Sequence, residues 1–183
     1  MRVNSRKNQS RVSDQTKVLT RSAIALALSM ISLLLFRGAT SIVSTFIIPV
    51  VIVLFSKRNE PISFIYIATG LLMMTALFFQ TQIVFVAGYL LLSLVLKYYL
   101  LDYRNKVMFS VPGILKYLFA VIVILFIGIQ LTQWIFLIPL HDMMLKLSNN
   151  QPLRYIGILL MEGIAITLVN LLLLKALTSR IKV

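Results

Sequence analysis

The sequence has no cysteine, a single histidine, His141, and only five acidic residues among its 183. Without cysteine, disulfide bonds, thiolate nucleophiles and cysteine metal sites are all excluded. One histidine cannot form a multi-histidine metal site, and the sequence contains neither an HExxH zinc motif nor a phosphate-binding GxxxxGK(S/T) loop. The sequence therefore predicts no metal ion, no other cofactor and no ATP hydrolysis by this chain.

Charged residues are scarce as well: they make up 13% of the chain, whereas about 25% is usual in soluble domains. Hydrophobic residues make up 60%. This composition excludes an ordinary soluble domain, and it excludes a disordered chain, because disorder requires low hydrophobicity. Apolar runs long enough to cross a bilayer indicate a multi-pass membrane protein instead.

Six apolar runs predict six membrane-spanning helices, at residues 20–36, 40–55, 62–79, 82–101, 117–139 and 155–175. Polar segments separate the runs, and the last connection covers residues 140–153. We expect an all-α integral membrane protein in which residues 19–183 form a compact bundle of six transmembrane helices. Residues 1–18 are expected to form a flexible basic cytoplasmic tail. Because no convincing small-residue cleavage site follows the first run, a retained helix is favoured over a cleaved signal peptide.

The 18 basic residues give the chain a net charge of +13, and their distribution predicts its orientation. With the N-terminus inside, fifteen of them lie on the cytoplasmic side and only three, Arg37, Lys146 and Arg154, lie outside. Cytoplasmic loops are enriched in lysine and arginine, so both termini are expected in the cytoplasm. Topology thus explains a charge that would indicate nucleic-acid binding in a soluble protein, and we expect a lipid bilayer as partner and no nucleic acid.

Small residues form a stripe along the first predicted helix. The stripe contains Ser22, Ala25, Ser29 and Ser32, and Ala23 and Ala27 lie beside it as a small-xxx-small pair. Helices in lipid associate closely where small residues let their backbones approach. Two interpretations stay open: the stripe packs inside this protein's own bundle, or Ser22, Ala23, Ala25, Ala27 and Ser29 dock another membrane subunit.

Glu162 is the one acidic residue inside a predicted span. A charged group at membrane depth costs about 2–3 kcal/mol on insertion scales, so Glu162 should face a partner or a wet cavity. It is either a protonated or hydrogen-bonded structural residue, paired for example with Arg154, or a ligand-binding residue. Gly163, Thr167 and Asn170 form a neighbouring small and polar stripe that suits helix packing as well as ligand contact.

Other polar residues are predicted at a similar, outer depth. Gln130, Gln133 and Trp134 share a helix face, and His141 and Asp142 follow in the last outer connection. A few polar groups in an apolar cleft are the usual form of a small-molecule site. The candidate solute-binding residues are therefore Gln130, Gln133, Trp134, Glu162 and Asn170, with headgroup contact as the alternative. Adjacent loop residues such as His141 and Asp142 rarely form a catalytic relay, so no catalytic residue is predicted.

Six short helices with both ends inside, in about 180 residues, resemble the substrate-capture (S) components of energy-coupling-factor transporters. The segment LTRSAIALALSMISLLLF carries the resemblance: its Ala23-xxx-Ala27 is similar to the alanine motif by which those subunits dock on a shared transmembrane coupling partner. The segment IIPVVIVLFSKRNEPISFIYIATGLLMMTALF looks like the second and third spans of a YybS-like membrane group. In many S components the first outer connection forms a sizeable lid over the binding pocket. Here that connection has only Arg37 to Ala39 available.

The resemblance implies a subunit of the bacterial cell membrane that binds a small solute from outside, while a coupling subunit and ATPase subunits drive its release inward. The lid would then be the 140–153 connection, with Met143, Met144, Leu145 and Leu147 as its apolar side. The alternative function is a non-transporting scaffold or assembly protein for cell-envelope or cell-shape machinery. An intramembrane enzyme would need several convergent catalytic groups, and Glu162 stands alone, so no enzymatic activity is expected.

Overall fold

The computed structural model describes residues 2–36, 42–56, 60–100 and 110–180. These residues form seven α-helices and one short 3₁₀ helix, η2, and contain no strand. In chain order the elements are α1 (Arg2–Leu35), α2 (Ile42–Phe55), α3 (Pro61–Phe78), η2 (Gln80–Gln82), α4 (Ile83–Leu100), α5 (Val111–Phe136), α6 (Leu140–Leu147) and α7 (Pro152–Arg180). The expected all-α class is confirmed.

Five segments in the described ranges are long and apolar enough to cross a membrane, which fits a multi-pass membrane protein. They are Gln15–Leu35, Pro61–Phe78, Gln80–Leu100, Val111–Phe136 and Pro152–Thr178. The segment expected at 40–55 is represented by α2, whose 14 residues span about 21 Å, less than the ~30 Å hydrocarbon core. The sixth span therefore stays a prediction, and so does the location of the termini.

Several boundaries differ from those expected. α5 begins at Val111 rather than 117, because Pro112 fits the first turn of a helix, where its missing N–H has no partner to lose. α5 ends at Phe136, where Leu137 adopts a left-handed conformation. α7 runs from Pro152 to Arg180, beyond both expected ends.

Two segments expected without regular structure are helical. The connection at 140–153 contains the eight-residue helix α6. The helix α1 begins at Arg2, within the expected tail, and no break marks a boundary at residue 19. Residues 2–18 contain neither proline nor glycine, the two residues that most disfavour a helix interior.

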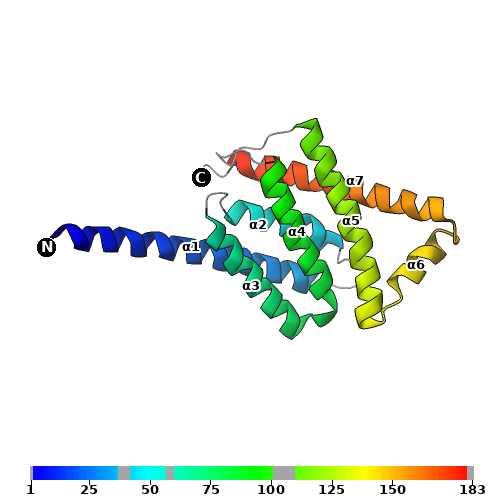
Figure 1. Ribbon diagram of the computed structural model, residues 1–183, viewed down its shortest axis with the longest axis horizontal. Coiled ribbons are helices and arrows are strands. Elements are labelled where there is room, and N and C mark those ends of the chain that lie inside the picture. The colour runs from blue at the N-terminus through cyan, green and yellow to red at the C-terminus, as the bar shows by residue number, and fades with distance from the viewer. Residues whose placement is uncertain (1, 37–41, 57–59, 101–109, 181–183) are drawn as a thin grey trace.

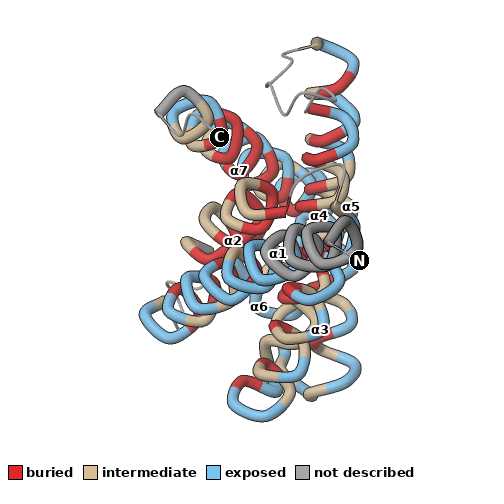
Figure 2. Tube along the Cα trace, turned by 90° about the vertical axis from the view of Figure 1, so that its left-hand side faces the viewer, coloured by how far each residue is buried: buried red, intermediate tan, exposed pale blue. Residues whose placement is uncertain are grey.

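The helices cross rather than run parallel (Figure 1). α1, α2 and α7 lie in similar directions, α3, α4 and α5 cross them steeply, and α1 extends beyond the rest at its N-terminal end. The helix α6 lies at the opposite end of the molecule, between the end of α5 and the start of α7. Buried positions gather on the inward sides of the helices, as Figure 2 shows for α5 and α7.

The core consists of two apolar clusters that share α2 and α4. One cluster joins these helices to α5 and α7 and includes Leu96, Tyr117 and Ile166. The other joins them to α1 and α3 and includes Ile48 and Leu71. Because α2 and α4 supply buried side chains to both clusters, they hold the two halves of the bundle together.

Glycines lie where helices approach each other closely. A Cβ atom on Gly88 would lie 2.8 Å from Ile124 Cγ2, where α4 meets α5. A Cβ atom on Gly163 would lie 2.7 Å from Ile122 Cγ1, where α5 meets α7. Both glycines are buried, so they let the backbones approach as small residues do in membrane helix pairs. Packing thus accounts for Gly163, the first member of the stripe on α7.

Candidate functional site

Glu162 lies about 15 Å along α7 from the first residue of that helix. Its side chain is partly buried, and it has no hydrogen bond and no ion pair within the part of the chain that the structure describes. Arg154, considered above as a structural partner, is exposed and makes no ion pair with it. Within the described residues, the carboxyl group therefore lacks the hydrogen bond or ion pair considered above for a structural role.

Tyr89 of α4 lies within electrostatic range of the Glu162 carboxyl group. Tyr89 is buried, and its hydroxyl oxygen accepts a hydrogen bond from Thr45 Oγ1 of α2 at 3.3 Å. Tyr89 and Thr45 are thus in hydrogen-bond contact, and Glu162 is within electrostatic range of Tyr89; we call these three residues the Glu162 site.

Sequence reasoning identified Glu162 but missed Tyr89 and Thr45. The sequence offered one indication of these two residues, because both carry hydroxyl groups inside apolar runs. Nothing in the sequence shows, however, that their helices pack against each other and that α2 also packs on α7. A polar residue in an apolar run is equally compatible with a hydroxyl bonded to its own helix, as for Thr75 with Leu71 O at 2.6 Å.

A second polar group connects α5, α6 and α7. Gln130 Nε2 donates to His141 Nδ1 at 2.9 Å, and the Tyr155 hydroxyl lies 3.3 Å from the same nitrogen. The His141 backbone N–H donates to Gln133 Oε1 at 2.9 Å, and Gln133 Nε2 donates to Asp142 Oδ2 at 3.4 Å. The rings of His141 and Tyr155 meet edge to face, with centroids 5.4 Å apart. These contacts fix α6 against its neighbours.

The structure does not gather all five candidate solute-binding residues. Gln130 and Gln133 lie in the polar group around α6, whereas Trp134 is 81% exposed and contacts none of them through a hydrogen bond. Asn170 is fully buried farther along α7, eight residues or about 12 Å beyond Glu162, and donates to the Tyr117 hydroxyl at 2.7 Å. A common depth was expected for Gln130, Gln133, Trp134 and Glu162. A common depth does not bring side chains together, because the rotation of each helix about its axis decides which side chains meet.

The small-residue stripe of α1 is divided between two environments. Ser22, Ala25 and Ser29 are buried, and Ser22 Oγ lies 3.2 Å from Ser63 Oγ of α3. Ala23 and Ala27 are exposed on the other side of α1. The buried residues pack inside the bundle, so that only the two alanines present a small surface to the outside.

A buried lysine is a residue that sequence reasoning did not single out. Lys97 was counted among the cytoplasmic basic residues, and its side chain is only 3% exposed. Its ammonium group donates to Ser56 Oγ at 3.5 Å, next to the end of α2, and lies 5.9 Å from the Phe64 ring centre. The negative end of the α2 dipole and the aromatic face both favour a cation. Its position inside the apolar run 82–101 was the available signal.

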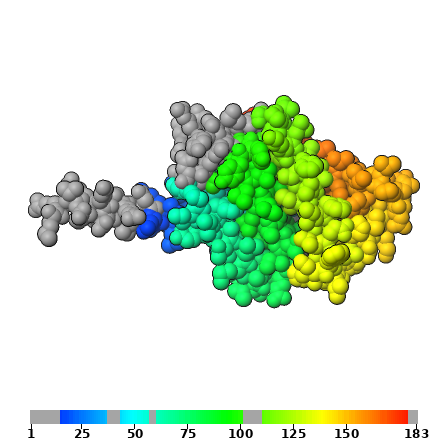
Figure 3. All heavy atoms as spheres, in the orientation of Figure 1, coloured from blue at the N-terminus to red at the C-terminus, as the bar shows by residue number. Residues whose placement is uncertain are grey.

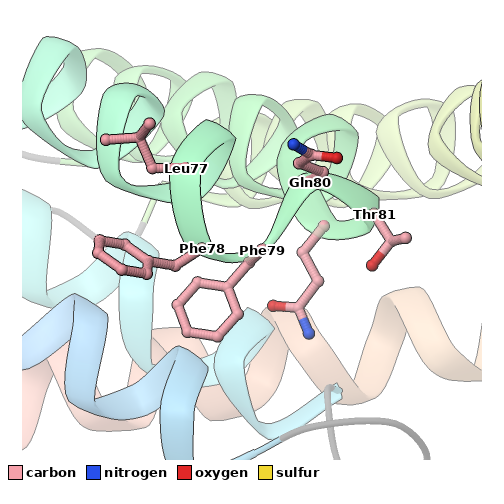
Figure 4. A pocket seen from close by; sticks show the side chains of 6 residues that line it. Leu77, Phe78, Phe79, Gln80 and Thr81 are labelled. Carbon is pink, nitrogen blue, oxygen red and sulfur yellow. The ribbon is translucent and has the colours of Figure 1, made fainter.

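An open pocket of about 380 Å³ lies at the turn between α3 and α4. Its lining consists of Leu77, Phe78, Phe79, Gln80, Thr81 and Gln82. Phe78 and Phe79 point to the same side of the turn, and Gln80 and Thr81 lie at the other end (Figure 4). None of the five candidate solute-binding residues lines it, and its two glutamines and one threonine carry no charge. Among the described residues, no group of three or more His, Asp or Glu side chains could hold a metal ion.

Comparisons with known proteins assign no family to this chain. The sequence matches no known family and no curated protein, and the structure matches no solved structure. Its function therefore has to be argued from the residues described above.

Proposed function

We propose that this chain is the solute-binding membrane subunit of a multi-component importer similar to the energy-coupling-factor type. The observation that carries the proposal is Glu162, a carboxyl group at membrane depth without a hydrogen bond or ion pair among the described residues. Such a group is costly in a membrane and marks a functional site by default. It binds the solute, while separate coupling and ATPase subunits supply the energy.

The chemistry of the Glu162 site favours a small solute with a cationic or hydrogen-bond-donating group. The Glu162 carboxylate accepts such a group, and the Tyr89 hydroxyl, within electrostatic range of it, offers a further acceptor or donor. The surrounding core is apolar, as in most small-molecule sites. No catalytic pair accompanies the carboxyl group within the described residues, so the proposal is binding without chemical change.

The complete topology belongs to the same proposal. α2 serves as a short sixth span, and the excess of basic residues on one side supports the proposal that both termini are cytoplasmic. The exposed Ala23 and Ala27 then provide a smooth surface on α1 for a coupling subunit. Reporter fusions at residues 59, 105 and 183 should give cytoplasmic signals, and one at 148 an external signal. An external signal at 183 would contradict this topology.

The test of function is purification in mild detergent from the native membrane, followed by mass spectrometry of retained small molecules and proteins. The Glu162→Gln variant should bind the retained solute about 10- to 150-fold more weakly, corresponding to the ~1.5–3 kcal/mol of a charge-assisted hydrogen bond. Asp142→Asn is the matched control, because it neutralises an exposed carboxyl that is part of the α6 contacts. Its solute affinity should stay unchanged.

Two outcomes would overturn the proposal. Unchanged solute retention in Glu162→Gln, together with a lowered melting temperature, would assign Glu162 to structure. Retention of envelope proteins without any small molecule would favour the scaffold function over import.

A further inference from the structure

The helix α6 is turned sharply at both of its ends. Leu137 precedes it with φ 56°, and Asn149 and Asn150 follow it with φ 53° and 57°. These are left-handed conformations, which asparagine tolerates better than most residues and leucine does not. The two reversals lay α6 across the end of the bundle between α5 and α7, as Figure 1 shows.

Successive residues of α6, 100° apart around its axis, divide it into three faces. The first face is packed on the protein: Leu140, Met144 and Leu145 lie against the core cluster of α5 and α7, and His141 hydrogen-bonds to Gln130. The second face is polar and exposed and carries Asp142 and Lys146. The third face is apolar and exposed, with Met143 at 57% and Leu147 at 70%.

The adjoining ends of α5 and α7 carry more exposed apolar side chains. Trp134 is 81% exposed, Leu137 86% and Leu153 83%. Figure 3 shows the yellow to orange atoms of this part of the chain at one end of the molecule. Exposed apolar side chains that surround a helix with a separate polar face are characteristic of a helix lying in a membrane interface.

We infer that α6 is an interfacial helix that lies along a phospholipid surface. Met143 and Leu147 enter the boundary of the acyl chains, while Asp142 and Lys146 face water. The charges fit this partner, because Lys146 and Arg154 are exposed and make no ion pair within the described ranges, so both can bind lipid phosphates. The inference sets the depth of the molecule in the bilayer and does not depend on solute binding.

The experiment uses the full chain in phosphatidylcholine vesicles with and without bromine on the upper part of the acyl chains, where bromine quenches tryptophan fluorescence. Trp134 is the single tryptophan of the sequence, so Trp134→Phe provides a silent background. In that background we compare Met143→Trp with Lys146→Trp. The apolar face of an interfacial helix lies about 5–10 Å into the boundary, so bromine should reduce the fluorescence of Met143→Trp about two- to threefold more than that of Lys146→Trp.

Equal quenching of the two variants, or none in Met143→Trp, would overturn the inference. The unmodified protein gives a second measurement that needs no substitution on α6. Its Trp134 should be quenched in brominated vesicles and should show blue-shifted emission, whereas water-like emission without quenching would contradict a lipid surface at this end. A negative result in the bromine-quenching test would not affect the proposed role of the Glu162 site, because the solute assay does not measure depth in the bilayer.

Discussion

A single methyl group on Gly163 should destabilise the bundle, and the structure allows the size of the effect to be worked out. The added Cβ would lie 2.7 Å from Ile122 Cγ1, 3.5 Å from its Cδ1 and 3.6 Å from Leu118 Cδ1. The first distance is too short, so the α5–α7 contact must widen or Ile122 must leave its position. Overpacking of this kind costs about 1–3 kcal/mol.

The same substitution also removes a glycine from a helix interior, which stabilises by about 0.5–1 kcal/mol. Gly157 of α7 separates the two effects, because a Cβ atom there would have no neighbour within 4 Å. Gly157→Ala should therefore be neutral or slightly stabilising. The difference between the two variants removes the shared propensity effect and should equal the packing effect alone, about 1–3 kcal/mol.

The assay is unfolding of the purified protein in mixed micelles with increasing denaturing detergent, followed by circular dichroism. Ile122→Ala removes the atom that clashes, so the Gly163→Ala/Ile122→Ala variant should be more stable than the sum of the single effects predicts, by about 0.5–3 kcal/mol. Equal stability of Gly163→Ala and Gly157→Ala would refute the close α5–α7 approach. Strict additivity in the double variant would refute Ile122 as the neighbour.

Three further predictions concern other buried residues. Tyr117→Phe should lower the free energy of unfolding by about 1–3 kcal/mol, because it leaves the buried Asn170 amide without its acceptor. Unfolding in denaturing detergent, as for the glycine variants, measures this loss. Ser29→Leu should prevent folding because Ser29 is fully buried, whereas Ala27→Leu should leave a folded monomer and affect only binding of a membrane partner, as judged by gel filtration and co-purification. Lys97, at 3% exposure, should react with a soluble amine-directed reagent far more slowly than exposed lysines. Mass spectrometry measures the labelling of each lysine, and equal labelling of Lys97 and exposed lysines would contradict its burial.

The sequence predicted the helical class because apolar runs of spanning length have few other folds available in a bilayer. It predicted less well where local signals compete. Residues 140–153 contain His141, Asp142 and a proline and look like a loop, yet the connection forms α6 because Met144 and Leu145 can pack on the core. Hydropathy alone could not predict α6, because eight residues are too few to show a distinct helical periodicity of apolar residues.

The candidate site was predictable to the level of single residues but not of their neighbours. Glu162 was identified because an acidic residue inside an apolar run is rare. This criterion does not depend on which side chains surround Glu162 in the folded protein. Its relation to Tyr89 depends on which helices are adjacent, which a single sequence does not encode in any local pattern. Asn170 was included as part of the small and polar stripe next to Glu162, but its side chain is fully buried and donates to Tyr117, so it belongs to the interior of the α5–α7 pair.

The central position of α2 has a consequence for the biosynthesis of this protein. This helix is short for the bilayer, and its buried side chains contact α4 and α7, which are synthesised after it. When α2 leaves the ribosome, only α1 is available to cover its buried polar residues, and the Ser32–Ser44 hydroxyl contact joins exactly that pair. The α1–α2 pair can therefore form first, whereas the contacts of α2 are complete only after α7 has been synthesised. A chain truncated before α7 would leave the side chains of α2 that pack on α7 uncovered.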